Sequence, residues 1–180
     1  NGRPNDNIGI TLFAGETFTQ CPLTVDHAVL LDMIHNIKCG LITDGTAVGM
    51  GIANAVTRLK DSKAKSKVII LLTDGTNNKG DISPMTAAEI AKSFGIRVYT
   101  IGVGTNGMAP YPYPVGNTVQ YVSMPVEIDE KTLTEIAGTT DGNYFRATSN
   151  SKLKEVYEEI DKLEKTKLNV KEYSKRDEEY

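Results

Sequence analysis

The sequence predicts an α/β fold with a doubly wound, mainly parallel sheet flanked by helices. Strand patterns and helix patterns alternate along most of the chain, which is typical of a parallel sheet. The aliphatic run from Val68 to Leu72 is continuous, as in strands that helices cover on both faces. The chain has 180 residues, 39% hydrophobic and 24% charged, which is enough for one domain with a substantial core.

The first part of the chain predicts two extended segments and a helix. Asn7–Gly15 is rich in β-forming residues, and Phe18–Pro22 is a short edge segment that Pro22 stops. A helix begins at Asp26, with Asp26 or Thr24 as its cap, because apolar residues follow at helical spacing. Those apolar residues are Val29, Leu30, Met33, Ile34 and Ile37.

Helices and strands alternate through the middle of the chain. A helix over about 47–59 places Ile52, Ala55, Val56 and Leu59 on one face, and the strand at 68–72 follows it. Ser83 and Pro84 are a capping residue and a first-turn proline, so they predict the start of the next helix. Its buried stripe is expected to be Ala87, Ile90, Ala91 and Phe94, with Gly95 ending it before a strand over 96–104.

The last third predicts two helices around a short strand. One helix runs from Asp129 to Ala137 and stops at Gly138, and the strand Asn143–Ala147 follows. The residues from Glu164 onward alternate in charge and predict a solvated, partly frayed end. The final helix carries an amphipathic stripe of Leu153, Val156, Tyr157, Ile160 and Leu163.

The segment between Gly104 and Asp129 interrupts this alternation and predicts an inserted β-ribbon at about 105–128. Its prolines at 110, 112 and 114 cannot donate to a ladder on both sides, and the Gly116–Asn117 pair can turn the segment into a hairpin. Packing across the ribbon is the favoured role of its tyrosines, with contact to a partner as the alternative. They are Tyr111, Tyr113 and Tyr121.

Composition argues against several functions. The formal net charge of -3 comes from 20 basic and 23 acidic residues without a basic block, so nucleic-acid binding is not expected. No aliphatic run is long enough to span a bilayer. Cys21 and Cys39 lack the spacing of a zinc site and are expected to be two separate core cysteines rather than a disulfide. His27 and His35 share a helix without ligands at metal-binding spacing.

The motifs give no support for catalysis. Residues 102–107 match GxGxxG after a strand, but MAPYPYP follows where a dinucleotide site requires a helix. The phosphate-binding GxxxxGK motif and the GxSxG motif do not occur in the sequence. No nucleophile can be combined with a base, so the chain is not expected to be an enzyme.

Two TDGT stretches carry the candidate site. Residues 43–46 precede a predicted helix, and residues 73–76 end the strand at the sheet edge where open α/β sheets bind ligands. Thr46 and Asp74 can therefore point into one crevice, where hydroxyl and carboxylate oxygens suit Mg²⁺, Ca²⁺ or Mn²⁺. The pattern also fits a structural role, in which Thr46 caps a helix and Asp74 caps a turn with Asn77 and Asn78.

Four stretches, in this order, resemble the von Willebrand factor A family: IGITLFAGETFTQCPLT, DGTAVGMGIANAVTRL, VIILLTDGTNNKG and IRVYTIGVG. Within that family, QCPLT and the segment inserted after IGVG are similar to the Bacteroides aerotolerance (Bat) proteins of bacteria. The resemblance covers roughly residues 5–168. It implies one domain over 1–168, interrupted by the ribbon at 105–128, and a charged tail over 169–180.

The resemblance implies a metal-ion-dependent adhesion site, which binds partner proteins without chemistry on a substrate. In the family, the ion is held by a DxSxS motif after the first strand, a threonine that opens a later helix and an aspartate after the central apolar strand. The threonine matches Thr46 and the aspartate matches Asp74, whereas Asp44 and Asn77 are neighbours without a match. A carboxylate of the partner completes the ion's open position.

The DxSxS motif does not occur in this sequence. Its nearest approach is Ser149-Asn150-Ser151, preceded by Ala147 where the aspartate is needed. The family's first strand, which lies between the IGITLF and VIILL strands, is also expected to be missing, and this leaves unpaired backbone groups along both neighbours. With Thr46 and Asp74 alone, binding of Mg²⁺, Mn²⁺ or Ca²⁺ is expected to be weak or absent.

Three explanations of the missing strand remain open. The strand precedes these residues in the natural protein, which is favoured, or the chain is truncated and swaps or repacks, or the family's core has been rebuilt.

By resemblance, the chain is expected to be a non-enzymatic interaction domain of a membrane-anchored bacterial Bat-type assembly linked to aerotolerance and stress. The expected partners are other Bat proteins or a MoxR-type AAA+ ATPase, at the bacterial inner membrane on its periplasmic side. Membrane contact is expected only through segments outside these residues. One alternative is a small-molecule-binding or hydrolytic α/β domain that uses Asp74 at the sheet edge, and another is a structural domain with a vestigial metal site.

Overall fold

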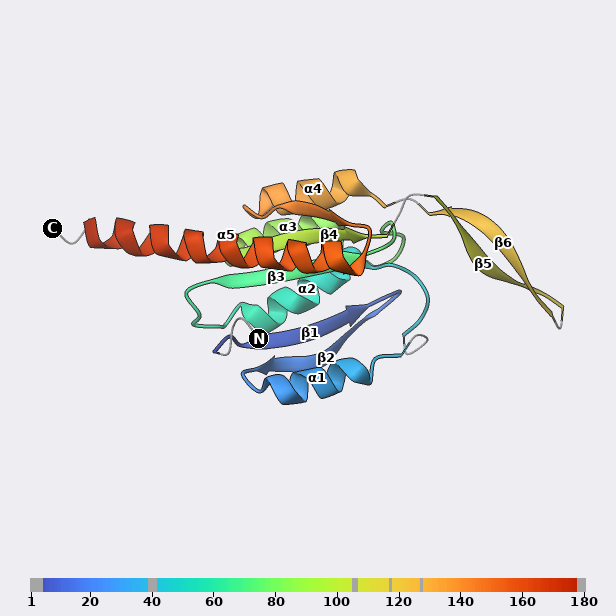
Figure 1. Ribbon diagram of the computed structural model, residues 1–180, viewed down its shortest axis with the longest axis horizontal. Coiled ribbons are helices and arrows are strands. Elements are labelled where there is room, and N and C mark those ends of the chain that lie inside the picture. The colour runs from blue at the N-terminus through green and yellow to red at the C-terminus, as the bar shows by residue number, and fades with distance from the viewer. Residues whose placement is uncertain (1–4, 39–41, 105–106, 117, 127, 178–180) are drawn as a thin grey trace.

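The computed structural model describes residues 5–38, 42–104, 107–116, 118–126 and 128–177. Within these ranges it gives the backbone alone at 107–112, 114, 124–126 and 168–177. The predicted α/β class is confirmed, because a parallel three-stranded sheet lies between layers of helices (Figure 1). The order of its strands is β3 (Lys67–Thr73), β4 (Ile96–Val103) and β7 (Tyr144–Ala147).

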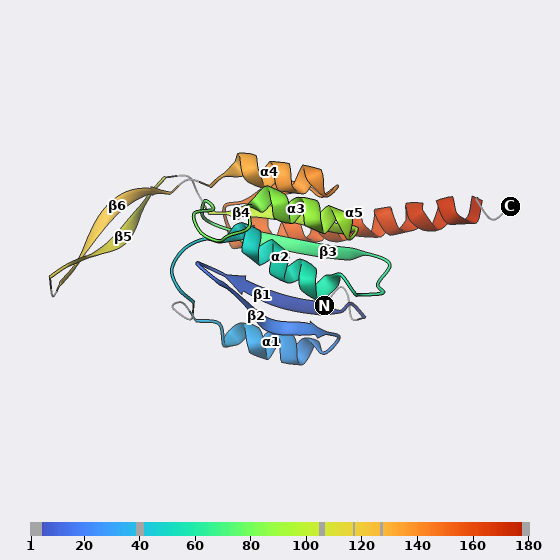
Figure 2. The same ribbon diagram turned by 180° about the vertical axis from the view of Figure 1, so that it is seen from behind.

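Helices cover both faces of this sheet, as a doubly wound fold requires (Figures 1 and 2). On one face lie α2 (Val48–Leu59), α3 (Pro84–Ser93) and α4 (Glu130–Thr139), and on the other lies α5 (Asn150–Asp177). Each interface is an apolar cluster. The larger includes Ile52, Ile69, Val98 and Ile136, and the smaller includes Tyr99, Ile101, Val156 and Ile160.

The predicted start of α3 is confirmed, but two of its predicted core residues are not buried. Ser83 Oγ accepts a hydrogen bond from the Thr86 N–H at 3.1 Å, and Pro84 begins the helix. Ile90 and Phe94 are 36% and 44% exposed, whereas the small residue Ala88 is buried together with Ala87 and Ala91. The helix packs closely between α2 and α4, so small side chains fill the contact.

The end of α4 also differs from the sequence prediction. The helix continues through Gly138 to Thr139. The buried hydroxyl of Thr140 lies just beyond that end and accepts a hydrogen bond from the Val98 N–H at 3.0 Å. The helix therefore ends where Thr140 contacts β4, and Gly138 does not end it as the sequence predicts.

A separate two-stranded antiparallel sheet precedes the main sheet in sequence. Its strands are β1 (Ile8–Phe13) and β2 (Thr17–Thr24). The expectation that Pro22 stops the second strand is wrong, because β2 continues to Thr24. The register shifts at this point, from Ile10 opposite Cys21 to Ile8 opposite Thr24. Pro22 is tolerated because it lies in this irregularity of a strand with a single partner.

Helix α1 (His27–His35) has the predicted cap but not the predicted core face. Asp26 Oδ1 accepts hydrogen bonds from the Ala28 and Val29 N–H groups, and Thr24 Oγ1 accepts one from the Asp26 N–H. Of the predicted apolar stripe, Leu30 is buried, and Ile37 lies beyond the end of the helix. Val29 and Ile34 are both more than 40% exposed. The helix packs on the small β1–β2 sheet, which covers little of its surface (Figure 1).

The inserted ribbon consists of β5 (Gly107–Val115) and β6 (Thr118–Val126), which project from the body of the molecule (Figures 1 and 2). Gly107 begins a strand, so the GxGxxG match opens no helix. The expected packing of the tyrosines is wrong for Tyr113 and Tyr121, which are 58% and 72% exposed. Tyr113 pairs with Gln120 and Tyr121 pairs with Pro112, so the two rings leave opposite faces. The Tyr111 side chain lies outside the described residues.

The end predicted to be solvated and frayed is helical as far as Asp177, because α5 continues through it. Its predicted stripe packs on the sheet through Val156 and Ile160, which are buried, while Tyr157 is 41% exposed. Among the described residues, no helix has the length and apolar character needed to cross a membrane.

Candidate functional site

A cavity of about 1820 Å³ separates β1 from β3, and both strands line it along their lengths. In the described residues, β1 pairs only with β2 and β3 pairs only with β4, so each strand leaves one edge without a partner strand. Helices α2 and α5 also contribute to the lining, through residues such as Ile52 and Ile160. The expected gap between the two strands, with unpaired backbone groups on both sides, is confirmed.

The carboxyl ends of β1 and β3 meet at the same end of this cavity. Gly15, just after β1, donates its N–H to the Thr43 carbonyl at 2.7 Å, and the Ala47 N–H bonds to the Ala14 carbonyl at 2.7 Å. The loop after β3 reaches the same segment, since the Asn78 N–H donates to the Thr46 carbonyl at 3.0 Å. The two strands therefore run in parallel, and their ends frame one site.

Asn77 and Asn78 hold the loop after β3 against the start of α2. Asn77 Oδ1 accepts a hydrogen bond from the Val48 N–H at 2.8 Å, and Asn78 Oδ1 accepts one from the Thr46 N–H at 2.9 Å. The N-cap of α2 is Ala47, which has no side chain for that role, so Asn77 caps the helix from another loop. The structural interpretation, with Thr46 as the cap and both asparagines in a turn with Asp74, is therefore wrong.

No local pattern in the sequence indicates this capping role of Asn77. The residue that it caps lies 29 positions earlier in the chain. Such a partnership depends on how the two loops approach each other in the fold.

Thr46 and Asp74 both line the cavity at this end, as the sequence predicts for a shared crevice. The loops approach so closely that a Cβ atom on Gly75 would lie 3.2 Å from Thr46 Oγ1. Thr46 is partly buried and Asp74 is exposed. Within the described part of the chain, no hydrogen bond engages the Thr46 hydroxyl or the Asp74 carboxylate, so both oxygens are available to a ligand.

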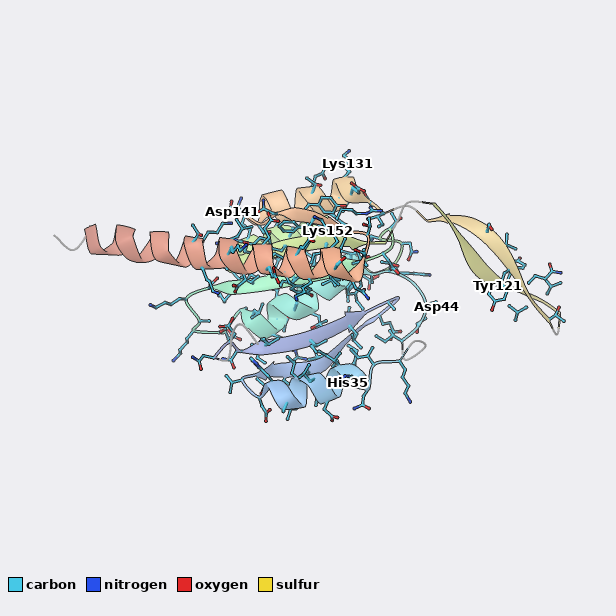
Figure 3. The ribbon with its side chains drawn as sticks, in the orientation of Figure 1. His35, Asp44, Tyr121, Lys131, Asp141 and Lys152 are labelled. Atoms are coloured by element: carbon cyan, nitrogen blue, oxygen red, sulfur yellow. The ribbon has the colours of Figure 1, made fainter. Side chains whose placement is uncertain are left out.

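The two TDGT stretches contribute different members to the cavity. The first contributes its last two residues, Gly45 and Thr46, and the second contributes its first two residues, Thr73 and Asp74. The counterparts of Asp74 and Thr46, which are Asp44 and Thr76, are exposed and do not line the cavity, and Figure 3 labels Asp44 on the loop beside it.

The donor set at this position is incomplete as a metal centre. Hydroxyl and carboxylate oxygens suit a hard divalent cation, which takes six or more ligands. Over the described ranges, no group of three or more His, Cys, Asp and Glu side chains is placed to hold a metal ion. Thr46 and Asp74 fit part of an oxygen-ligand shell and require further ligands.

Other polar residues singled out from the sequence lie away from this position. His27 also lines the cavity, but its ring contacts the Asp6 carbonyl at 3.3 Å, beside the start of β1 and at the opposite end from Asp74. His35 is exposed at the end of α1 (Figure 3). Ser149 Oγ accepts a hydrogen bond from the Lys152 N–H, so the nearest approach to DxSxS caps α5. Cys21 is buried and free, while Cys39 lies outside the described residues.

The sequence matches that of known proteins over most of its length. The von Willebrand factor type A domain matches residues 1–159. An uncharacterized protein of Borreliella burgdorferi is 26% identical over 170 residues, which cover 94% of this chain and 50% of that protein. The chain spans about half the length of the curated relatives that it matches.

The fold matches solved structures of bacterial proteins. BatB from Bacteroides thetaiotaomicron has a TM-score of 0.75 and 34% identity, with coverage of 89% of this chain and 80% of that one. An aerotolerance-related membrane protein from Bacteroides fragilis has a TM-score of 0.72 and 31% identity, with coverage of 88% and 80%.

A structure with an occupied metal site also matches. The mussel byssus protein PTMP1, solved with zinc in its metal-ion-dependent adhesion site, has a TM-score of 0.64 and 26% identity. The match covers 88% of this chain and 36% of that one.

Proposed function

Because this chain belongs to the von Willebrand factor A family, we propose that it is a non-enzymatic protein-interaction domain with a partly built metal-ion-dependent adhesion site. One observation carries the proposal. Two loops far apart in sequence bring the free oxygens of Thr46 and Asp74 to one end of the cavity between β1 and β3. The structural roles that would otherwise explain these loops are performed by Asn77 and Asn78.

The proposed ion is Mg²⁺ or Mn²⁺, held by the Thr46 hydroxyl and the Asp74 carboxylate. Both donors are oxygens, which these hard cations prefer, whereas the zinc in PTMP1 belongs to that protein. When bound, the ion supplies a positive centre that a partner's carboxylate can coordinate. Mg²⁺ gives up its water reluctantly, so two protein oxygens hold it weakly, and an added strand is proposed to supply further protein ligands.

The cavity supports this account of the missing ligands. A strand laid between β1 and β3 would pair with both free edges and end beside Thr46 and Asp74, because both neighbours run toward that end. By resemblance, the DxSxS segment of the family follows such a strand. The site is therefore proposed to be complete when that strand is in place.

The proposed setting is a bacterial Bat-type assembly at the inner membrane, with this domain on the periplasmic side. The matches to BatB and to an aerotolerance-related membrane protein support it. The proposed partners are other Bat proteins or a MoxR-type AAA+ ATPase. The chain spans about half of its curated relatives, so these partners are proposed for the whole protein.

Calorimetric titration with Mg²⁺ and Mn²⁺ tests the site. It compares this chain with a version in which a strand carrying DxSxS is joined ahead of Asn1. We expect weak or absent binding to the first and measurable binding to the second. Thr46→Ala and Asp74→Ala should each lower the affinity of the joined chain by at least about tenfold, since each removes an ion ligand.

The two TDGT stretches provide matched controls for this titration. Asp44→Ala and Thr76→Ala change the same residue types in the same motifs, but at positions outside the cavity lining. Both should bind the ions like the joined parent chain. The proposed site is wrong if the joined chain binds neither ion, or if Asp44→Ala lowers the affinity as much as Asp74→Ala.

A further inference from the structure

The ribbon of β5 and β6 is an exposed apolar arm. It projects from the body in both views of the molecule (Figures 1 and 2). Its described apolar side chains are open to solvent, with Val119 58%, Tyr121 72% and Val122 47% exposed. A two-stranded hairpin that packs on nothing else is marginally stable in water, so this arm is expected to gain stability from another surface.

The two outer edges of the ribbon differ in their hydrogen-bonding groups. In an antiparallel pair, opposed residues alternate between positions that bond to each other and positions whose backbone groups point outward. Proline has no N–H, so the uninterrupted ladder places the three prolines of β5 at outward-pointing positions. The residues opposite them on β6 also point outward, and the pairs are Pro110–Ser123, Pro112–Tyr121 and Pro114–Val119.

One edge is therefore closed to a further strand and the other is open. At three successive outward positions, β5 offers carbonyl groups without an N–H. At Val119, Tyr121 and Ser123, β6 offers both an N–H and a carbonyl group, whereas Pro125, which pairs with Met108, closes only the last outward position of this edge. A strand can add to β6 but not to β5.

We propose that β6 pairs with β6 of a second copy of this chain, so that two ribbons form one antiparallel sheet with two-fold symmetry. The register that uses every open group places Tyr121 opposite Tyr121 of the second copy, and Val119 opposite Ser123. Both outer edges of the combined sheet are then β5 edges, which the prolines close. The association stops at two copies, as a closed two-fold contact requires.

The charge of the ribbon favours a second copy over other occupants. Residues 107–126 contain no Lys, Arg, Asp or Glu. Charged side chains commonly prevent edge strands from pairing with their own kind, and β6 has none. A ribbon without charge offers nothing to complement a charged partner protein, and it lacks the basic residues that attract acidic lipid headgroups.

Sedimentation velocity over a range of protein concentrations tests this contact. The natural sequence should show a monomer–dimer equilibrium. Tyr121→Pro should weaken the dimer by at least about tenfold, because proline removes both central backbone bonds across the two-fold axis. The Tyr121 N–H is not used within the ribbon, so the ribbon and the body should stay folded. Tyr121→Val is the matched control, since it removes the ring, keeps the N–H and should keep the dimer.

A disulfide trap tests the register independently. In a chain with Cys39→Ser, Tyr121→Cys places two thiols across the axis, where directly opposed Cα atoms lie about 5.5 Å apart, within disulfide range. Oxidation should yield a covalent dimer. In this register Thr118 of one copy does not lie opposite Thr118 of the other. Thr118→Cys, on the same strand, should therefore yield little covalent dimer.

Three results would overturn the proposal. The first is a chain that stays monomeric up to about millimolar concentration, well above the Kd range of specific complexes. The second is a dimer that survives Tyr121→Pro, which would place the contact elsewhere, for example at the cavity between β1 and β3. The third is a monomer that binds phosphatidylcholine vesicles through the ribbon, which would assign the arm to a membrane surface. Ion binding by Tyr121→Pro should equal that of the parent, so this test is separate from the adhesion-site proposal.

Discussion

Glu164 joins α5 to the sheet through a buried polar cluster. Its side chain is 4% exposed, accepts hydrogen bonds from the Tyr99 hydroxyl at 2.6 Å and the Ser66 hydroxyl at 2.8 Å, and forms an ion pair with Arg97. The ammonium group of Lys167 lies 5.8 Å from the centre of the Tyr99 ring. A buried carboxylate with this many donors fixes where the helix lies along the sheet.

Replacing Glu164 should lower stability in a way that depends on pH. Burial raises the pKa of Glu164, but the hydrogen bonds from Tyr99, Ser66 and Arg97 and the charge of Arg97 together lower it below its ordinary value of 4.5. Because the folded-state pKa is the lower one, the stabilisation is fully present above pH 4.5 and is lost as the pH falls through the folded-state pKa. Glu164→Gln should cost about 2 kcal/mol at pH 7 and less at pH 3.

Urea unfolding at the two pH values measures this difference. Glu159→Gln, at an exposed position of the same helix, should change stability by less than about 0.5 kcal/mol at either pH. If Glu164→Gln costs the same at both pH values, the charge of Glu164 does not contribute to stability.

At the residue scale, the sequence predicts that Thr46 and Asp74 share a crevice, and both line one end of the cavity, but it does not indicate what holds their loops. Thr46 and Asp74 were expected together because the ends of parallel strands share one edge. The capping role of Asn77 was missed because its partner, the Val48 N–H, is distant in sequence and reaches it only where two loops approach each other. Glu164 looked like part of a solvated charged run, since its hydrogen-bond donors lie on β4 and just before β3.

At the scale of the elements, replacing two helical glycines by alanine should change the stability of the chain in opposite directions. A Cβ atom on Gly49 of α2 would lie 2.0 Å from the Ile82 carbonyl, so the helix and the loop before α3 touch through backbone. Gly49→Ala should therefore destabilise the chain by about 2 kcal/mol. Gly138 of α4 has open space at its Cβ position, and Gly138→Ala should stabilise by about 0.5 kcal/mol, because alanine favours helix.

Thermal unfolding of both alanine variants checks this pair, with Gly49→Ala lowering the Tm and Gly138→Ala raising it. A rise in Tm for both variants would show that α2 can move away from the loop before α3 without a loss of stability.

The elements that could be predicted are those with strong local signals. The strand at 68–72 and the capped start of α3 depend on short sequence patterns, and the structure has both. The strand past Pro22 and the faces of the ribbon tyrosines depend on register, which is set between strands. The apolar faces of α1 and α3 depend on how much surface their neighbours cover, which helical spacing alone does not specify.

The cavity between β1 and β3 divides the whole molecule into two unequal parts. On one side, β1, β2 and α1 contribute two buried side chains among the described residues, Cys21 and Leu30. On the other side, the parallel sheet holds both apolar clusters. No described backbone ladder crosses the cavity, so the smaller part is held to the larger one through α2 and the loops around Thr46.

Hydrogen exchange under native conditions should therefore show two levels of protection. Amides of β1 and β2 should exchange through local opening, at a free energy at least about 2 kcal/mol below that of β4, because few buried apolar contacts and no ladder oppose that opening. The amides of β4 lie between two strands and should exchange only through global unfolding.

Joining the DxSxS strand ahead of Asn1 should raise the protection of β1 and of the free edge of β3. The added ladder would couple the two parts into one cooperative unit, whereas β4 already has a strand on each side. Equal protection of β1 and β4 in the present chain would show that α2 alone unites the two parts. Unchanged protection of β1 after the strand is joined would show that the cavity does not accept a strand.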